Sequence, residues 1–449
     1  FSGNGLIDVS GYQGGGTLLF GGDYQGQGSV PNATDVFVGP NTQTFADAVT
    51  NGNGGKLIFW ADRRMRFYGI VKGRGGKYFG DGGFVEVSGK EELFFDGSVD
   101  TTAANGKTGT LLLDPDNIII ESGSGTPTAD SGAVTFTTYE TTLEANSATS
   151  NVILLATSSI KFGADANDVV SLDLQGSGNS ITFTVTNGTI TYQNSNSSVT
   201  TQGGDINFSA KNGLAVGNLV SNDGDISLSG SSLSLLGNLN SGTGDIKVSH
   251  SDGGNIGLGS SSTCGGTCSM TLTTTDLDKM TANKLTIGNL TNGDIYVAGF
   301  DQSATIFQNE VELIVGTHIS GAKGEINFEG SSSSFTTLTA KAVNGVNVNA
   351  SLTTTVGSLT IDGDSDNGID QLSAKDDINI ASGVTLTSAG AISLSAKTGG
   401  IDAASALTLT APTSITLTGD LTVAGAVVLT ANSGITLNGN ITTSSGNLT

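Results

Sequence analysis

The stretch "GGDINFSAKNGLAVGNLVSNDGDISLSGSSLSLLGNLNSGTGDIKVS" (Gly203–Ser249) repeats a short motif at a fixed spacing. The tripeptide Gly-Asp-Ile starts at Gly204, again at Gly224 and again at Gly244, so the interval between copies is constant. Each Ile is followed two residues later by another apolar residue, and residues two apart on a strand point to the same face. Strands and turns that recur with a period of roughly 20 residues are typical of a solenoid.

The C-terminal segment indicates how many strands make up one period. The stretch "SITLTGDLTVAGAVVLTANSGITLNGN" (Ser414–Asn440) contains three apolar pairs in three short strands, and the cycle that starts at Ile415 restarts at Ile435. No helix-length segment with a 3.6-residue period interrupts the pattern. The sequence therefore predicts an all-β parallel β-helix, with coils of roughly 20 residues and three short strands in each.

Composition divides the chain into three expected regions of one continuous solenoid. Residues 1–110 hold all four Arg, the only Trp and 10 of the 18 Phe, with 9 basic against 11 acidic residues. The remainder holds 9 basic against 30 acidic residues. We expect an aromatic and basic module over 1–120, less regular coils with loop excursions over 121–200, and regular acidic repeats over 201–449.

Two further features concern the less regular region and the ends of the chain. Residues Tyr139–Asn146 favour a short helical or looped excursion from the coils. Native solenoids carry capping segments, and both ends of this sequence instead follow the strand pattern. We therefore expect the chain to be a piece of a longer protein.

Charge and hydropathy disfavour several partners. A net charge of −23 argues against a nucleic acid or an anionic membrane surface as the partner. The sequence has no run of 18 consecutive apolar residues, so we expect no membrane span. The first residues, Phe1-Ser2-Gly3-Asn4-Gly5, have neither the basic nor the apolar part of a signal peptide.

The sequence offers no catalytic constellation, so we predict that the chain is not an enzyme and needs no cofactor, with calcium as the one exception discussed next. The two His residues, His250 and His318, stand apart from any motif. A polysaccharide-cleaving β-helix would need clustered carboxylates with a basic residue or bound Ca²⁺. No Arg follows Arg74.

One acidic loop has the spacing of a calcium site. In "DGDSDNGID" (Asp362–Asp370), carboxylates alternate at Asp362, Asp364 and Asp366, and Asp370 could add a ligand. The glycine of the sharp turn comes one position late, and the closing Glu of a calcium loop is absent. The segment is therefore either a Ca²⁺ loop or a plain acidic turn.

A second candidate site mixes basic and aromatic residues in "RRMRFYGIVKGRGGK" (Arg63–Lys77). Such a mixture could bind an acidic glycan or a nucleic acid. The same mixture is also expected of an ordinary strand whose basic residues point outward into solvent and alternate with buried residues. The candidate ligand residues are Trp60, Arg63, Arg64, Arg66, Tyr68, Lys72, Arg74 and Lys77.

The two cysteines, Cys264 and Cys268, flank the short segment Gly265-Gly266-Thr267. They are too few for a disulfide framework or a zinc site. Either they close one small loop as a disulfide in an oxidising compartment, or they are two free surface thiols.

Several phrases near the N-terminus carry a resemblance to a known family. They are "GGGTLLFGGDYQGQG" (Gly14–Gly28), "GNGGKLIFWAD" (Gly52–Asp62), "GDGGFVEVSGKEEL" (Gly80–Leu93), "GKTGTLLLDPDNIII" (Gly106–Ile120) and "TTLEANSATSNVILLAT" (Thr141–Thr157). In these residues and in their order, the chain resembles filamentous haemagglutinin-type proteins, which Gram-negative bacteria export by two-partner secretion. The remaining two thirds match that family only as generic repeat, and the family's N-terminal secretion domain and its toxin-like C-terminal domains are absent from this sequence.

The resemblance implies a right-handed parallel β-helix that is displayed on, or shed from, the bacterial outer surface after export through an outer-membrane transporter. We expect a non-enzymatic adhesin or stalk that binds a glycan or protein of a host or neighbouring cell. Three alternatives remain open: a filament or sheath subunit that binds itself, the stalk of a contact-dependent toxin, and a polysaccharide-active enzyme.

Overall fold

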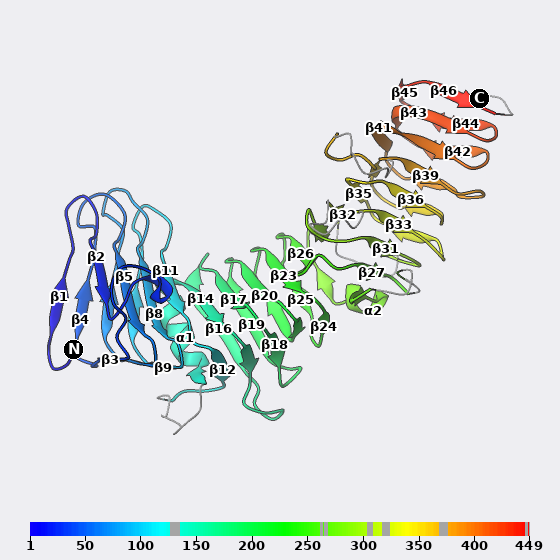
Figure 1. The fold of residues 1–449 in the computed structure, drawn as a ribbon. Helices are drawn as coiled ribbons and strands as arrows, with labels where there is room; N and C mark the ends of the chain where they lie inside the picture. Colours follow the sequence, from blue (N-terminus) through cyan, green and yellow to red (C-terminus); the bar gives the residue numbers. More distant parts are fainter. Residues whose placement is uncertain are drawn as a thin grey trace. The chain divides into compact units, whose positions relative to one another are not determined.

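The computed structural model is an all-β structure with 51% strand and 4% helix, built from parallel strands in sequence order. This confirms the predicted parallel β-helix (Figure 1). The structure describes residues 1–125, 135–260, 264, 268–302, 309–316, 324–367, 376–444 and 448. The chain divides into two compact units, one of residues 1–227 with 234–243 and one of residues 228–233 with 244–449.

In the first unit, strands of successive coils pair in parallel, so each coil lies on the next. One sheet is formed by β1 (Leu6–Asp8), β4 (Gln43–Phe45), β7 (Ile70–Lys72) and β10 (Ser98–Asp100). The site sheet, as we call the second, contains β2 (Thr17–Phe20), β5 (Lys56–Ala61), β8 (Phe84–Gly89), β11 (Thr110–Leu113), β14 (Asn151–Ala156), β17 (Ile181–Val185) and β20 (Ile206–Ala210).

Three further sheets complete the coils of this unit. The first contains β3 (Asp35–Val38), β6 (Arg64–Phe67) and β9 (Glu92–Phe95). The second contains β13 (Phe136–Tyr139), β12 (Asn117–Glu121), β15 (Ser159–Phe162), β18 (Thr189–Tyr192) and β21 (Gly213–Val216). The third contains β16 (Ser171–Ser177), β19 (Ser198–Gln202), β22 (Asn218–Val220) and β25 (Leu239–Asn240). Strands β23 (Ile226–Gly230) and β24 (Leu233–Leu235) contain the boundary between the units.

The first coils are longer than the sequence repeat predicts. Lys56 pairs with Phe84 in the next coil, whereas Ser198 pairs with Asn218, which follows it at the shorter interval of the Gly-Asp-Ile repeat. The additional residues lie in turns such as 73–83, where a surface loop can lengthen without disturbing the pairing of the strands. The repeat seen in the sequence therefore describes only the coils with tight corners.

A short helix, α1 (Glu140–Ser147), leaves the coils between β13 and β14. This confirms the excursion predicted at Tyr139–Asn146. Its buried Asn146 donates from Nδ2 to the Gly97 carbonyl (3.1 Å) and accepts the backbone N–H of Val99 (2.9 Å). These bonds fix the helix to the coil that contains β10.

The second unit consists mainly of three columns of parallel strands. The first contains β26 (Ile246–His250), β30 (Lys284–Asn289), β32 (Glu310–Val315), β35 (Leu338–Ala342), β38 (Leu359–Asp362), β41 (Ile392–Ala403), β43 (Ser414–Val423) and β45 (Gly434–Asn438). The second contains β28 (Met270–Leu272), β27 (Ile256–Leu258), β31 (Ile295–Val297), β33 (Ile326–Phe328), β36 (Val346–Val348), β39 (Ile378–Ile380) and β46 (Ile441–Thr443), with the later halves of β41 and β43 between the last two. The third contains β34 (Ser333–Phe335), β37 (Leu352–Thr354), β40 (Leu386–Ser388), β42 (Leu407–Ala411) and β44 (Val427–Ala431). The short α2 (Thr274–Leu277) and β29 (Met280–Thr281) follow β28.

Apolar side chains at alternate positions form the core inside the coils. On β20, Ile206, Phe208 and Ala210 are buried, while the residues between them are partly exposed. Aromatic rings stack from coil to coil, as with Phe183 and Phe208, whose centroids are 4.6 Å apart. Full burial of each large apolar side chain contributes about 1.5–3 kcal/mol to folding.

The recurring Gly-Asp-Ile motif forms a corner that only glycine fits. A Cβ atom placed on Gly224 would lie 2.3 Å from the carbonyl oxygen of Gly204 in the coil before it. The Asp205 carboxylate accepts the backbone N–H of Asp225 (2.9 Å), and buried Ser221 donates to the Gly224 carbonyl (2.5 Å). Gly204 makes the same kind of close approach, to the Asn179 carbonyl oxygen, and its own carbonyl accepts the Thr201 hydroxyl, so two successive copies of the motif form the same corner.

We predict that Gly224→Ala destabilises the chain by about 1–3 kcal/mol, because the new methyl group must push one coil away from the next. The urea midpoint followed by circular dichroism measures the change. Gly39→Ala is the matched control, since an added Cβ there meets no atom closer than 3.4 Å. Equal midpoints for the two variants would contradict this account of the corner.

Candidate functional site: a lateral pocket on the site sheet

A loop of residues 21–34, between β2 and β3, covers the outward face of the site sheet. It contains the 3₁₀ turn η1 (Tyr24–Gly26). Gly26 lies so close to Trp60 that a Cβ atom on it would be 2.5 Å from the indole ring. Trp60 is consequently only 6% exposed although it projects from the outer side of β5.

Glu86, on β8, is the charged residue that this loop buries. Its register partners in the neighbouring coils are apolar, Ile58 on β5 and Leu112 on β11. Glu86 is 0% exposed, and its carboxylate accepts the backbone N–H of Gln25 (3.1 and 3.3 Å) and the Ser88 hydroxyl (2.8 Å). The Glu86 side chain therefore attaches the loop to β8 through the backbone of Gln25.

Gln25 takes an uncommon backbone conformation at this contact. Its φ of 53° lies in the left-handed region, which costs a residue with a side chain about 1–3 kcal/mol. The Gln25 backbone N–H is shared between both carboxyl oxygens of Glu86, and this hydrogen bond offsets part of the cost. The geometry of the loop thus depends on Glu86.

Burial changes the acidity of two carboxyl groups here. Burial raises the pKa of Glu86 to about 7, against the lowering effect of its bonds to Ser88 and Gln25. Burial also raises the pKa of Asp114, just after β11, to about 7, and the charges of Glu86 and Asp116 add to the effect. Near neutral pH, a substantial fraction of each group therefore keeps its proton.

Beside the loop lies a pocket of about 470 Å³, which we call the lateral pocket. Its walls come from the loop and from successive coils of the site sheet. The lining residues are Gln25, Gly26, Gln27, Asn32, Trp60, Asp62, Lys90, Asp114, Pro115, Asp116, Leu155, Ala156, Thr157 and Thr186.

Asp62 organises one wall of the lateral pocket. Its Oδ1 accepts from the Trp60 indole N–H (3.0 Å) and from Asn32 Nδ2 (3.0 Å). Asn32 Nδ2 also donates to the Gly26 carbonyl (3.0 Å). These hydrogen bonds connect the loop to the end of β5 at the side of the pocket.

The predicted basic and aromatic residues do not form one patch. Trp60 lies on the site sheet, Arg64 and Arg66 lie on β6, and Lys72 lies on β7, so they belong to three different sheets of one coil. Arg63 pairs with Asp35, and Arg64 pairs with Glu92. Arg66 lies over the ring of Phe94 (5.9 Å), and the rings of Tyr68 and Phe37 are 6.1 Å apart.

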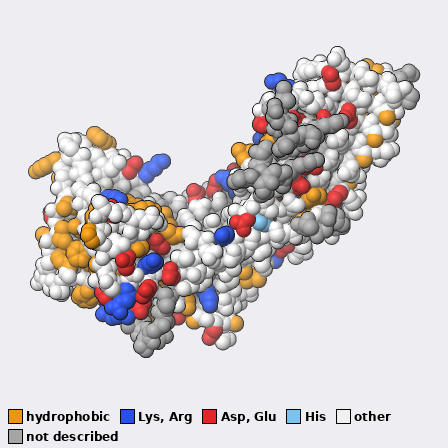
Figure 2. Space-filling model, viewed as in Figure 1, with side chains coloured by type: hydrophobic (Ala, Val, Ile, Leu, Met, Phe, Trp, Pro, Cys, Tyr) orange, Lys and Arg blue, Asp and Glu red, His pale blue; other side chains and the backbone are white. Residues whose placement is uncertain are grey.

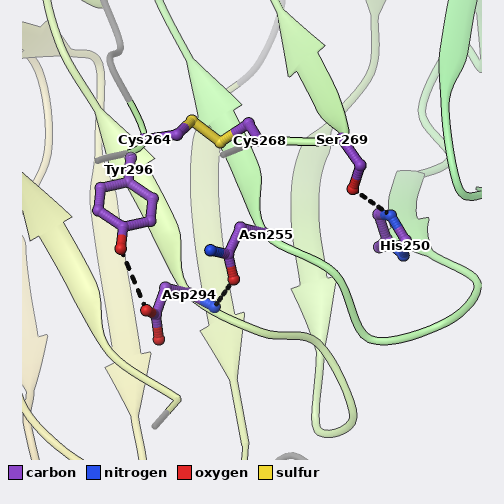
Figure 3. Close-up of a disulfide and its surroundings, with 7 residues drawn as sticks. All are labelled: His250, Asn255, Cys264, Cys268, Ser269, Asp294 and Tyr296. Atoms are coloured by element: carbon purple, nitrogen blue, oxygen red, sulfur yellow. Dashed lines mark hydrogen bonds between the residues drawn. A yellow bond between two sulfur atoms is a disulfide. The ribbon is translucent and has the colours of Figure 1, made fainter. Parts of the chain in front are cut away.

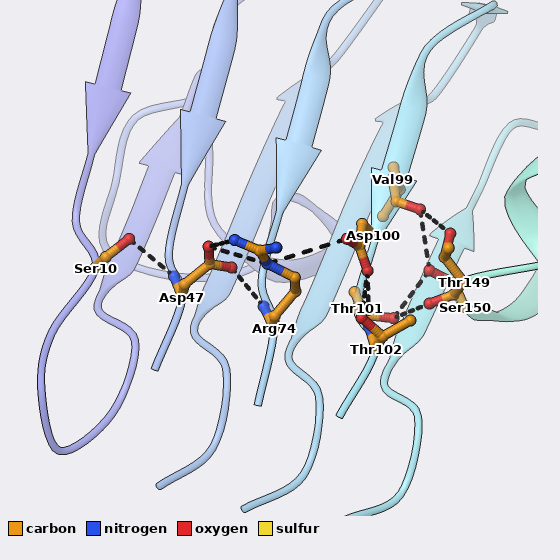
Figure 4. Close-up of polar contacts among 9 residues, drawn as sticks. All are labelled: Ser10, Asp47, Arg74, Val99, Asp100, Thr101, Thr102, Thr149 and Ser150. Atoms are coloured by element: carbon orange, nitrogen blue, oxygen red, sulfur yellow. Dashed lines mark hydrogen bonds and ion pairs between the residues drawn. The ribbon is translucent and has the colours of Figure 1, made fainter. Parts of the chain in front are cut away.

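Arg74 lies at the corner that follows β7, where Figure 4 shows it between Asp47 and Asp100. Asp47 accepts from the Arg74 side chain (2.6 Å) and from its backbone N–H (2.7 Å), and the Asp100 carboxylate is 4.0 Å from Arg74 Nε. Lys72 lies over Phe45 (5.3 Å) and Lys77 over Tyr78 (5.4 Å). Arg74 and Lys72 thus contact residues of the preceding coil and Lys77 contacts its neighbour in the chain, so these cations do not gather into one cationic surface.

The predicted calcium residues are only partly described. Asp362 ends β38, and burial raises its pKa. Asp364 is buried, and its Oδ2 accepts from the Thr398 backbone N–H (2.7 Å) and hydroxyl (2.9 Å). Within the ranges that the structure describes, no group of three or more His, Cys, Asp or Glu side chains, Asp366 included, is arranged to hold a metal ion. Asp370 lies outside the described residues, and the calcium loop remains a prediction.

Cys264 and Cys268 are joined as a disulfide, with Cα atoms 5.3 Å apart (Figure 3). The same region holds His250, whose Nε2 lies 2.6 Å from the Ser269 hydroxyl. His250 Nδ1 accepts two backbone N–H groups, from Asp252 (3.1 Å) and Gly254 (2.9 Å). The neutral ring therefore carries its proton on Nε2 and donates to Ser269, so it is not placed to act as a base for that hydroxyl. His318 lies outside the described residues.

Sequence reasoning missed the lateral pocket. Two signals were present: the glycine-rich "GGDYQGQG" (Gly21–Gly28) interrupts strand alternation, and Glu86 stands in the apolar phrase "GFVEV" (Gly83–Val87). Neither signal indicates that residues as distant as Gln25 and Thr186 line one cavity. Coil lengths and strand register determine which residues line the cavity. Neither can be derived from the sequence of the first coils, because insertions make those coils unequal in length.

Comparison with models of known protein families and with curated proteins finds no match for this chain. Among the described residues, no helix is both long enough and apolar enough to cross a membrane. Function is therefore inferred from the geometry of the lateral pocket and its surroundings.

We predict that the stability of the first unit falls as pH rises from about 4.5 to about 7. In this window the unfolded chain releases the Glu86 proton while the folded chain retains it, so rising pH favours unfolding; Asp114 acts in the same direction. Urea unfolding, followed by the fluorescence of Trp60, the only Trp, measures this dependence. Glu86→Gln should reduce the dependence of the unfolding free energy on pH, whereas the exposed control Glu91→Gln should leave it unchanged. The same pH dependence in both variants would refute the assignment to Glu86.

We predict that the denatured, unreduced chain has no thiol that reacts with a colorimetric thiol reagent. Two thiols should become reactive after reduction, because Cys264 and Cys268 are the only cysteines and they are bonded to each other. Two reactive thiols before reduction would show that the disulfide is absent.

Proposed function

We propose that this chain is part of an extracellular bacterial adhesin, a β-helical scaffold that binds a glycan or protein of another cell without altering it. The observation that carries the proposal is the lateral pocket, which has polar walls and is built by a loop that departs from the repeat. A loop on a rigid scaffold is a common way to present a binding site.

Glu86 and His250 are not placed for catalysis, whereas Asp114 lines the lateral pocket with a pKa raised to about 7. Glu86 has the raised pKa expected of a general acid, but the loop seals it from the pocket and both its oxygens accept hydrogen bonds from the protein. A catalytic acid must reach the atom that it protonates. His250 is likewise committed to backbone donors and Ser269.

Exposed aromatic side chains give the first unit a second surface suited to contact. Tyr12, Tyr78 and Phe79 are 73%, 63% and 60% exposed, and apolar side chains are visible on the surface of this unit in Figure 2. Thr50 donates its backbone N–H to Tyr12 and accepts that of Tyr78, so the turns that carry these two tyrosines flank a common neighbour. Aromatic groups exposed in this way are typical of interaction surfaces.

Two observations support the extracellular location. The phrases near the N-terminus resemble secreted filamentous haemagglutinin-type proteins, whose route of export uses an outer-membrane transporter. The Cys264–Cys268 disulfide is of the kind that persists in oxidising compartments.

We predict that beads coated with the complete chain are retained on intact bacterial or epithelial cells under flow, several-fold more than beads coated with serum albumin. The chain should release no reducing sugar or peptide from those cells during the assay. Retention no greater than that of the albumin beads on any cell type would contradict adhesion, and steady release of reducing sugar would favour the enzyme alternative.

A further inference from the structure

The lateral pocket holds polar side chains that the protein itself does not use. Within the described part of the chain, the side chains of Gln25, Gln27, Lys90, Asp114 and Asp116 make no hydrogen bond. Gln27 and Lys90 are exposed and the other three are partly exposed, so water can serve all five until a ligand displaces it. The cavity therefore offers a ligand five polar side chains that hydrogen bonds within the described chain do not occupy.

These groups combine donors with acceptors. The Lys90 ammonium and the amide NH₂ groups of the two glutamines donate, and the Asp116 carboxylate and the amide oxygens accept. The Asp114 carboxyl, which keeps its proton in a substantial fraction of molecules near neutral pH, can do either. A sugar hydroxyl both donates and accepts, so a saccharide can satisfy such a mixed set. An apolar ligand would leave the groups unpaired, and an anionic ligand would be repelled by the Asp116 carboxylate and by the charged fraction of Asp114.

Part of the pocket wall is fixed before any ligand arrives. Asn32 uses both amide hydrogens within the protein, on Asp62 Oδ1 and on the Gly26 carbonyl, and this leaves its oxygen as an acceptor at the rim. The coils behind the pocket are tied by backbone bonds, such as Lys90 N–H to Ala61 (3.0 Å) and Thr186 N–H to Ala156 (3.0 Å). Such preorganisation reduces the cost of binding.

From these features we propose that the lateral pocket binds a neutral saccharide of one or two sugar units through hydrogen bonds. The inference rests on the proposed adhesive function and names its ligand class. The volume of about 470 Å³ is within the range of roughly 300–1,000 Å³ typical of small-ligand pockets. Trp60 is almost fully covered, so recognition here depends on hydrogen bonds and not on stacking against an exposed ring.

A glycan array probed with the complete, labelled chain tests the ligand class, with neutral, amino and acidic oligosaccharides as separate groups. The expected result is binding to neutral members, followed by isothermal titration calorimetry with the best neutral oligosaccharide. Gln27→Ala and Asp114→Asn should each weaken that binding by about tenfold, the effect of losing roughly one good hydrogen bond.

Gln13→Ala is the matched control for Gln27→Ala, because Gln13 is also exposed and lies outside the pocket lining. Trp60 fluorescence and thermal unfolding establish that each variant is folded. Binding only to acidic or only to amino oligosaccharides, or equal affinity in the pocket variants and the control, overturns the saccharide assignment. If coated beads still adhere to cells in that case, the adhesin proposal stands; if the beads fail to adhere as well, both proposals fall.

Discussion

The close parallel stacking of one coil on the next is the constraint on which the rest of the structure depends. Backbone hydrogen bonds hold adjacent strands about 4.8 Å apart. At that separation a corner has no room for a side chain that points toward the neighbouring coil, and Gly224 against Gly204 shows this. The same spacing lets one side chain recur as a ladder, as when Asn347 donates to Asn327 (2.8 Å) and Asn379 donates to Asn347 (3.2 Å).

Stacking strongly limits which amino acids can occupy the inward and corner positions of a coil, and it limits the outward positions only weakly. New functions are therefore easiest to add on the outside, through loops that leave a corner and return to the next strand. The loop 21–34 does this, and it turns the outward face of β5, β8 and β11 into a second buried layer. Glu86 is a buried ionisable group of that layer, and its retained proton reflects the cost of burying a charge.

Sequence reasoning predicted the fold correctly because apolar residues alternate with a period of two along the strands. The alternation of Ile206, Phe208 and Ala210 and the return of Gly-Asp-Ile led to the right fold. Reasoning from proximity in the sequence failed for the basic and aromatic segment, because a chain that turns at every corner sends Trp60, Arg66 and Lys72 to different sheets. The lateral pocket could not be derived, since its lining depends on register across coils of unequal length.

The architecture also bears on what kind of chemistry the pocket supports. A strand of the site sheet cannot shift without breaking the hydrogen bonds to both neighbours, so the walls formed by Asp114, Ala156 and Thr186 stay at fixed separations. Fixed walls favour recognition of one ligand shape with little reorganisation. Two carboxyl groups here have a pKa raised to about 7: Glu86 is used to fasten the loop, whereas Asp114 lines the pocket and can contact the ligand. Rigidity therefore favours a site that fits one ligand shape, with Asp114 as the acid of raised pKa in its wall.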